Sequence, residues 1–170
     1  MPTPPADTPE QADLGAIDAL MAAFYRMFCN LGGARPNLAL IYDLFIPEGL
    51  VIKHGAGAPE IFNLQQFIAP RERLLTDGTL AEFQEAEVAA RTEVFGNIAQ
   101  RTSLYRKSGR WSGVPFQARG VKTTQLVRTA AGWRISALAW DDEREGFRLP
   151  EPGAGWTLAP GPESGKGTDM

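Results

Sequence analysis

The sequence predicts an α+β domain in which three N-terminal helices pack on a long, strongly curved antiparallel sheet, forming a cone-shaped half-open barrel. Before residue 77, apolar residues recur every three or four positions, which is typical of amphipathic helices. From Leu80 onward the period changes to two, which indicates strands with one buried face. These strands exceed the usual length of about five or six residues. Strands of that length twist and coil, so we expect the sheet to bend around the helices.

Composition limits the classes of protein to consider. The chain has 170 residues, of which 44% are hydrophobic, and this suits one domain with its own core. Its net charge of −3, with scattered Lys and Arg, argues against a nucleic-acid partner. The sequence shows neither the parts of a signal peptide nor an apolar run of the ~18 residues that a membrane span requires. We therefore predict a cytoplasmic protein without a membrane partner.

Three helices are expected in the first half of the chain. Thr8-Pro9-Glu10-Gln11 combines a hydroxyl cap, a proline at the first position and a glutamine three residues later, so the first helix begins there and should end at Gly32-Gly33. A short second helix is expected over residues 38–45. Asn63 can cap a third over residues 64–75, which Pro70 should kink or divide.

Five strands are expected. The first is brief, over residues 50–54, and the others span 80–94, 98–107, 116–128 and 133–142, with a loop around Trp111. Gly96 and Gly120 are plausible bend points in the long strands. The domain thus occupies residues 9–148. We expect disorder in residues 1–8 and in the Gly/Pro-rich tail 149–170, where Trp156 and Leu158 are the residues able to dock onto the domain or a partner.

Several stretches of the sequence resemble one known group of proteins. They are Phe67–Gly78, Phe95–Ala99, Arg119–Val127 and Gly132–Arg144, in this order. The chain, over residues 14–148, resembles the nuclear transport factor 2-like superfamily, also called SnoaL-like, and within it a bacterial branch of undescribed function. The resemblance implies a pocket between the concave sheet face and the helices, and a homodimer formed through the outer sheet face. It leaves activity open, because this superfold hosts both enzymes and non-catalytic binders.

Candidate catalytic residues are the polar side chains that can reach such a pocket. His54, the only histidine, ends the first short strand and could serve as a general base near neutral pH. Asp141 and Asp142 end the last strand and point to opposite faces, so one of them can point inward. Tyr25 could donate its hydroxyl to an oxyanion, although it also fits the apolar stripe of its helix.

Candidate ligand-binding residues are Tyr42, Arg101, Gln125 and Trp140. Arg101 is unusual because it lies in the middle of a strand, where an inward arginine needs an anionic partner or ligand. With Asp43 and either strand-end aspartate it could also form the Asp–Arg–Asp set of an epoxide-hydrolase-type site. Trp133 and Trp140 are seven residues apart, so strand alternation places them on opposite faces and only one of them in the pocket.

Other kinds of site lack a signal in the sequence. It has no Cys/His set of metal ligands, no glycine-rich phosphate loop and no Gly-x-Ser-x-Gly motif, so we predict no metal and no cofactor. The leading hypothesis is a homodimeric small-molecule-binding domain with a mostly apolar pocket and an apolar ligand. One alternative is an isomerase, dehydratase or epoxide-hydrolase-type enzyme that transfers a proton in that pocket. The other is a dimeric protein-interaction module, so whether the protein is an enzyme is left open.

Overall fold

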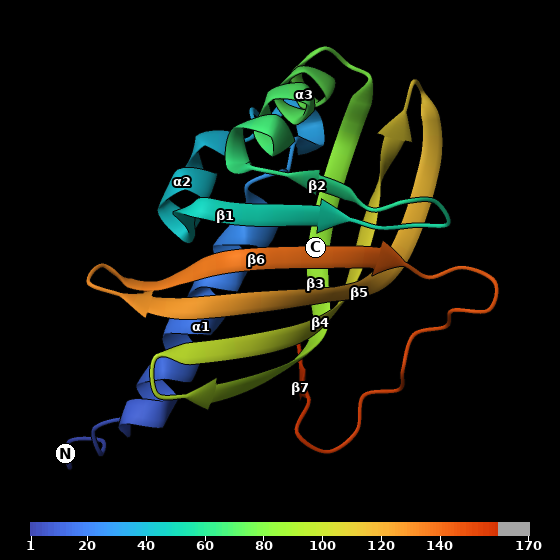
Figure 1. Ribbon diagram of the computed structural model, residues 1–170. Helices are drawn as coiled ribbons and strands as arrows, with labels where there is room; N and C mark the ends of the chain where they lie inside the picture. The colour runs from blue at the N-terminus through green and yellow to red at the C-terminus, as the bar shows by residue number, and fades with distance from the viewer. Residues whose placement is uncertain (160–170) are drawn as a thin grey trace, which may run out of the picture.

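The computed structural model describes residues 1–159 (Figure 1). The helices are α1 (Pro9–Arg26), α2 (Ile41–Leu44) and α3 (Leu64–Thr76), with 3₁₀ turns at Leu31–Gly33 and Leu38–Leu40, and the strands are β1 (Phe45–Lys53), β2 (Glu60–Phe62), β3 (Leu80–Phe95), β4 (Ile98–Trp111), β5 (Val114–Thr129), β6 (Gly132–Asp142) and β7 (Thr157–Leu158). The predicted α+β class, with helices on a curved, unclosed sheet, is confirmed.

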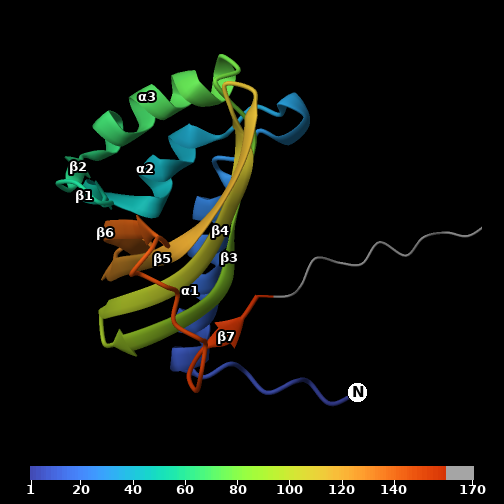
Figure 2. The ribbon, with the colours of Figure 1, turned by 90° about the vertical axis from the view of Figure 1, so that its right-hand side faces the viewer.

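The strands form one sheet in the order β2-β1-β6-β5-β4-β3-β7. The four long strands β3 to β6 pair antiparallel, as predicted, but β1 pairs parallel with β6, so the sheet is mixed. A parallel pair needs a long crossover between its strands, and residues 54–131 supply it. Figure 2 shows the long strands bending so that the sheet curls around the helices.

Helix α1 begins as predicted but ends earlier. The Thr8 hydroxyl accepts from the Gln11 backbone N–H, and the Gln11 side chain accepts from the Thr8 N–H. The helix ends at Arg26 rather than at Gly33. Buried Asn30 explains the difference, because its amide donates to the carbonyl oxygens of Leu75 and Leu80 and accepts from the Phe83 N–H. Tertiary hydrogen bonds therefore replace the last predicted turns of helix.

Two further boundaries differ from the prediction. Helix α3 continues through Pro70 without division. Strand β1 begins at Phe45 rather than at residue 50, because a bulge between Phe45 and Leu50 lets Phe45 pair with Ile135 on β6. The expected loop around Trp111 is a tight turn at Ser112-Gly113, where both residues have positive φ, so β4 reaches Trp111.

A bulge in β6 corrects the predicted facing of the two tryptophans. Gln125 pairs with Ala137 but its neighbour Leu126 pairs with Ile135, so Ser136 is an extra residue on β6. The inserted residue reverses the alternation beyond it. Trp133 therefore lies in the core, and Trp140 packs against the same core rather than on the opposite face.

The core lies between the concave sheet face and the helices. At its centre are fully buried residues from α1, β1, β4, β5 and β6, including Phe24, Phe45, Tyr105, Leu126 and Ile135. Within residues 1–159, no helix combines the length and apolar character that crossing a membrane would require.

The tail after β6 returns to the domain. Thr157 and Leu158 form β7, which pairs with β3 at the sheet edge, and the Arg91 guanidinium lies over the Trp156 ring. The docking onto the domain that was predicted for Trp156 and Leu158 is therefore present in the structure, within the tail for which disorder is predicted. Residues 160–170, predicted to belong to the same disordered tail, lie outside the described residues.

Gly120 is required by a close approach between strands. A Cβ there would overlap the Asp141 carbonyl oxygen and lie 2.6 Å from Tyr105 Cζ. We predict that Gly120→Ala lowers the free energy of unfolding by about 1–3 kcal/mol in urea denaturation, because backbone must shift to admit the methyl group. The control is Gly15→Ala on exposed α1, where no atom lies within 4 Å; there a gain of up to about 1 kcal/mol is expected. Equal effects would contradict this role of Gly120.

Candidate functional site

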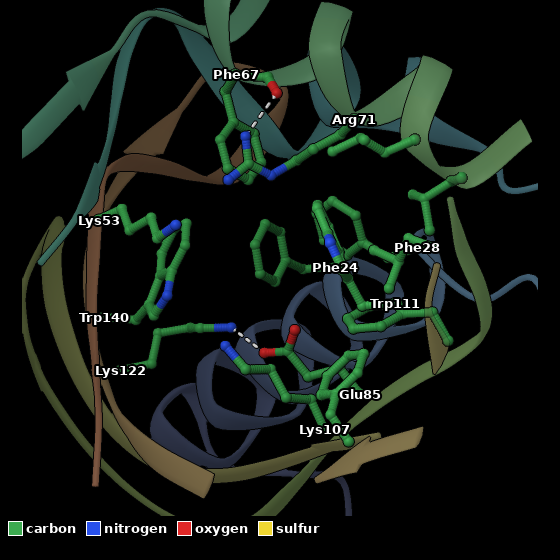
Figure 3. A pocket seen from close by; sticks show the side chains of 15 residues that line it. Phe24, Phe28, Lys53, Phe67, Arg71, Glu85, Lys107, Trp111, Lys122 and Trp140 are labelled. Atoms are coloured by element: carbon green, nitrogen blue, oxygen red, sulfur yellow. Dashed lines mark hydrogen bonds and ion pairs between the residues drawn. The ribbon is translucent and has the colours of Figure 1, made fainter. Parts of the chain in front are cut away.

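A cavity of about 280 Å³ lies between α3 and the concave face of the sheet, near the turn that joins β4 to β5. Figure 3 shows the side chains around it. The lining residues are Phe24, Phe28, Lys53, Phe67, Arg71, Leu74, Leu75, Leu80, Phe83, Glu85, Lys107, Trp111, Phe116, Lys122 and Trp140. We call this cavity the main pocket.

Aromatic rings form most of the pocket wall. Phe67 of α3 meets Phe28 and Trp140 edge to face, with ring centroids 6.0 and 5.9 Å apart. Phe83 and Phe116 stack on the opposite side at 6.5 Å. Such rings present both apolar area and polarised faces, so they suit a flat apolar ligand.

Four cationic side chains also line the main pocket, and strand register explains how three of them arrive there. Trp140 on β6 pairs with Lys53 on β1 and with Lys122 on β5, so the tryptophan and these two lysines form one row across the sheet. On the other side, Lys107 of β4 pairs with Glu85 of β3. Glu85 is the only acidic residue of the described chain that lines this pocket.

Lys122 and Glu85 form a buried ion pair at the base of the pocket. Lys122 is 3% exposed and its ammonium group donates to the Glu85 carboxylate (Figure 3). The ammonium also lies 4.4 to 4.9 Å from the ring centroids of Phe24, Tyr25 and Tyr105. Burial lowers the pKa of Lys122, while Glu85 and the ring faces favour the charged form.

The positive charge of Lys107 is compensated by a carboxylate at the edge of the pocket. Its ammonium lies 3.0 Å from the Asp142 carboxylate, which also accepts a hydrogen bond from the Tyr105 hydroxyl. The missing side chain of Gly120 allows Tyr105 to reach across β5 to Asp142. Burial and this aspartate raise the pKa of Tyr105, so it stays protonated at neutral pH.

Arg71 enters the pocket from α3. Its guanidinium carbon lies over the aromatic side of the pocket, 3.8 Å from the Phe67 ring centroid and 5.8 Å from that of Trp140. One N–H donates to the Phe67 carbonyl oxygen at 3.0 Å. No carboxylate within residues 1–159 forms an ion pair with it. Burial lowers the pKa of Arg71 to about 10, so the group is still cationic at neutral pH.

Two of the predicted residues, Tyr25 and Arg101, line a different hollow, between α1, β3 and the returning tail. Arg101 is 6% exposed, and its guanidinium donates to Glu87, to Asp18 at 2.6 Å and to the Thr92 hydroxyl at 2.8 Å. The anionic partner that an inward arginine needs is therefore supplied by the protein itself, and Asp43 has no part in it.

The remaining predicted residues are dispersed. Trp140 lines the main pocket and Asp142 touches its edge through Lys107, whereas Asp141 pairs with Arg144 at the strand end. His54 is exposed, with the Gly55 N–H donating to its Nδ1 at 2.9 Å. Tyr42 is 54% exposed, and Gln125 lines a shallow groove on the outer sheet face. The structure does not bring these residues together in one site.

Sequence reasoning missed Arg71, Lys122, Lys107 and Glu85. Arg71 had a detectable signal, because it falls four residues after Phe67 on the apolar stripe of α3, where a cation is unexpected. Lys122 alternates with Thr124 and Leu126, both buried, which was a signal for an inward lysine. Within the described range, no three His, Cys, Asp or Glu side chains gather in a way that could hold a metal ion.

Comparison with known proteins gives a fold and no activity. No protein-family model and no curated protein matches the sequence. Solved structures do match. A nuclear transport factor 2 (NTF2-like) superfamily protein from Salmonella enterica serovar Typhimurium superimposes with a TM-score of 0.63 at 15% identity, covering 77% of this chain and 91% of its own. The protein has an NTF2-like fold.

Two other solved structures share this fold. An NTF2-like protein of unknown function from Silicibacter pomeroyi gives a TM-score of 0.56 at 18% identity, covering 80% of this chain and all (100%) of its own. A protein from Novosphingobium aromaticivorans, proposed to be an aromatic ring hydroxylase, gives 0.64 at 16% identity, covering 90% and 96%. At these identities the NTF2-like fold is shared, and function is not settled.

The Lys122–Glu85 pair should contribute to stability, and removing its carboxylate should change how stability depends on pH. Glu85→Gln leaves the Lys122 ammonium buried without a counter-charge, so we expect a loss of about 3 kcal/mol in the free energy of unfolding at pH 7, measured in urea. The folded state then lowers the pKa of Lys122 further below its unfolded value of about 10.4, and the unfolded state binds more protons. Stability of this variant should therefore rise as the pH is raised from 7 toward 10.

The matched control is Glu72→Gln. Glu72 is exposed on α3, and its carboxylate lies 3.9 Å from Arg35. A change within about 0.5 kcal/mol is expected, because exposed ion pairs contribute little. If Glu85→Gln cost no more than Glu72→Gln, the pair at the base of the pocket would be solvated rather than buried.

Proposed function

We propose that the protein is a small-molecule-binding domain whose ligand occupies the main pocket. The observation that carries the proposal is the aromatic wall around a cavity of about 280 Å³. This volume is near the lower limit of small-molecule sites, about 300 Å³, so the ligand is small. A concave, mostly apolar cavity with a few convergent polar groups is the usual form of such sites.

Two features support the main pocket over the hollow that holds Tyr25 and Arg101. The side chains of that hollow are already paired, since Arg101 donates to Glu87 and Asp18. The main pocket offers stacked rings and polar groups that point into its space (Figure 3). The Novosphingobium protein of the same fold is proposed to be an aromatic ring hydroxylase, which is consistent with an aromatic ligand here.

An enzyme that moves a proton in the main pocket is the second candidate. It is favoured by the Lys122–Glu85 pair, because a desolvated lysine beside a carboxylate can exchange a proton with a ligand. The test is exchange of the α-protons of cyclohexanone in D₂O, followed by proton NMR. Exchange faster than in buffer, and abolished by Lys122→Met, supports the enzyme; the buffer rate with and without protein contradicts proton transfer to a ketone.

We also propose that the protein is a cytoplasmic homodimer that pairs through the outer sheet face. Short side chains on the outer face of β4, β5 and β6 support this, among them Thr102, Thr123, Ala137 and Ala139 around the shallow groove that Gln125 lines. Sedimentation equilibrium at micromolar concentration should give twice the chain mass of 18.5 kDa. A single-chain mass would contradict the dimer, and with it the dimeric interaction module.

Filling the main pocket should abolish ligand binding. In a screen of neutral and charged aromatic fragments by saturation-transfer NMR, we predict fragments that bind the wild type but not Leu74→Trp, because Leu74 lines the pocket and the larger ring takes its space. Thermal unfolding first establishes that the variant is folded.

Ile61→Trp is the matched control for this screen. Ile61 is 59% exposed on β2, outside the main pocket, so the same fragments should bind this variant as they bind the wild type. Fragments that bind Leu74→Trp unchanged would contradict the pocket as the ligand site.

A further inference from the structure

We propose that the ligand of the main pocket is a small aromatic monocarboxylate and that Arg71 holds its carboxylate. This inference rests on the proposed function, which it makes more specific. The charges around the pocket, more than its shape, point to this ligand. Three of the four cations that line it have a carboxylate partner, and one does not.

One of the four cations that line the pocket has no carboxylate partner in the described part of the chain. Lys122 pairs with Glu85, and Lys107 pairs with Asp142 at 3.0 Å. Lys53 lies 3.8 Å from Glu60, with both side chains partly exposed. Arg71 forms no ion pair with any residue from 1 to 159. The uncompensated charge at the pocket is therefore that of one guanidinium, which matches a ligand with a single negative charge.

Arg71 is held in a fixed orientation. Its guanidinium lies against the Phe67 ring, and one N–H donates to the Phe67 carbonyl oxygen one helical turn away. These two contacts hold the guanidinium at the pocket before any ligand arrives (Figure 3). A planar fork with free N–H groups matches a carboxylate, which can accept two parallel hydrogen bonds.

A half-buried cation among rings is costly without an anion. Burial disfavours its charged form, as the lowered pKa of Arg71 reflects. Contacts with the faces of Phe62, Phe67 and Trp140 offset part of that cost. Glu60 and Glu85 favour its charge from a distance, but Glu60 lies beside Lys53 and Glu85 is already engaged by Lys122. A ligand carboxylate can supply the remaining compensation.

The rest of the ligand is defined by the walls. Phe83 and Phe116 stack on one side of the pocket, and Trp111 lines it near the β4–β5 turn. These residues offer faces for a flat ring and few hydrogen-bonding atoms. The cavity of about 280 Å³ admits one or two fused rings. A phosphate monoester, which carries close to two charges, would leave one of them without a cation in this arrangement.

The test compares three naphthalene probes by isothermal titration calorimetry on the full chain. They are 2-naphthoate, neutral 2-naphthol and 2-naphthyl phosphate, which share the ring and differ in the attached group. We expect the wild type to bind 2-naphthoate at least tenfold more tightly than either of the others. A charge-assisted bidentate pair is of the strength that such a ratio requires.

Variants of Arg71 separate its role from general positive charge. Arg71→Gln should weaken 2-naphthoate binding at least tenfold and change 2-naphthol binding less than threefold. The affinity of Arg71→Lys for 2-naphthoate should lie between those of the wild type and of Arg71→Gln, because a lysine keeps the charge but loses the planar guanidinium fork. Arg73→Gln, an exposed position on the same helix, is the matched control and should bind 2-naphthoate as the wild type does.

Each outcome bears on one of the two proposals. Equal affinity for 2-naphthoate and 2-naphthol, unchanged by Arg71→Gln, would overturn the carboxylate inference while leaving the main pocket as a ligand site. Tighter binding of 2-naphthyl phosphate than of 2-naphthoate would overturn the choice of carboxylate. Probe binding that survives Leu74→Trp would place the site elsewhere and overturn the proposed function as well.

Discussion

The burial of positive charge inside an aromatic cavity is the constraint on which this structure depends. Lys122, Lys107 and Arg71 all lie where water is partly or wholly excluded, and each requires compensation. Glu85 and Asp142 supply it for the lysines, and each pair joins two strands that lie on either side of a third strand in the sheet. Ring faces assist Lys122 and Arg71. The fold therefore has to bring these groups together for their charges to be compensated inside the cavity.

Bulges in the long strands and one glycine place these charged and aromatic side chains next to one another. The extra residue Ser136 turns both Trp133 and Trp140 toward the core, and it leaves Asp142 within reach of Tyr105. Gly120 removes the side chain that would block this contact. A further bulge, between Glu87 and Ala89 on β3, ends the row of inward carboxylates at Glu87, which pairs with Arg101 in the other hollow. Two separate ionic clusters thus result from single-residue shifts of register.

The sequence was sufficient for the elements that local chemistry determines. The capping boxes at Thr8 and Asn63 and the change of period at Leu80 predicted the helix starts and the long strands. It was insufficient where distant groups decide, as with Asn30, whose bonds to Leu75, Leu80 and Phe83 end α1 early. The site was harder to predict than the fold, because one bulge changes which side chains of β6 point inward. Of the residues predicted to bind a ligand, Trp140 lines the main pocket, whereas Arg71 was not among them.

The most direct measurement is a crystal structure of the protein soaked with 2-naphthoate. We expect the naphthalene ring between Phe67 and Phe83 in the main pocket, with both carboxylate oxygens within hydrogen-bond distance of the Arg71 guanidinium. The Lys122–Glu85 pair should remain intact beneath it. A ligand found in the hollow beside Arg101, or in the main pocket with its carboxylate turned away from Arg71, would contradict the account.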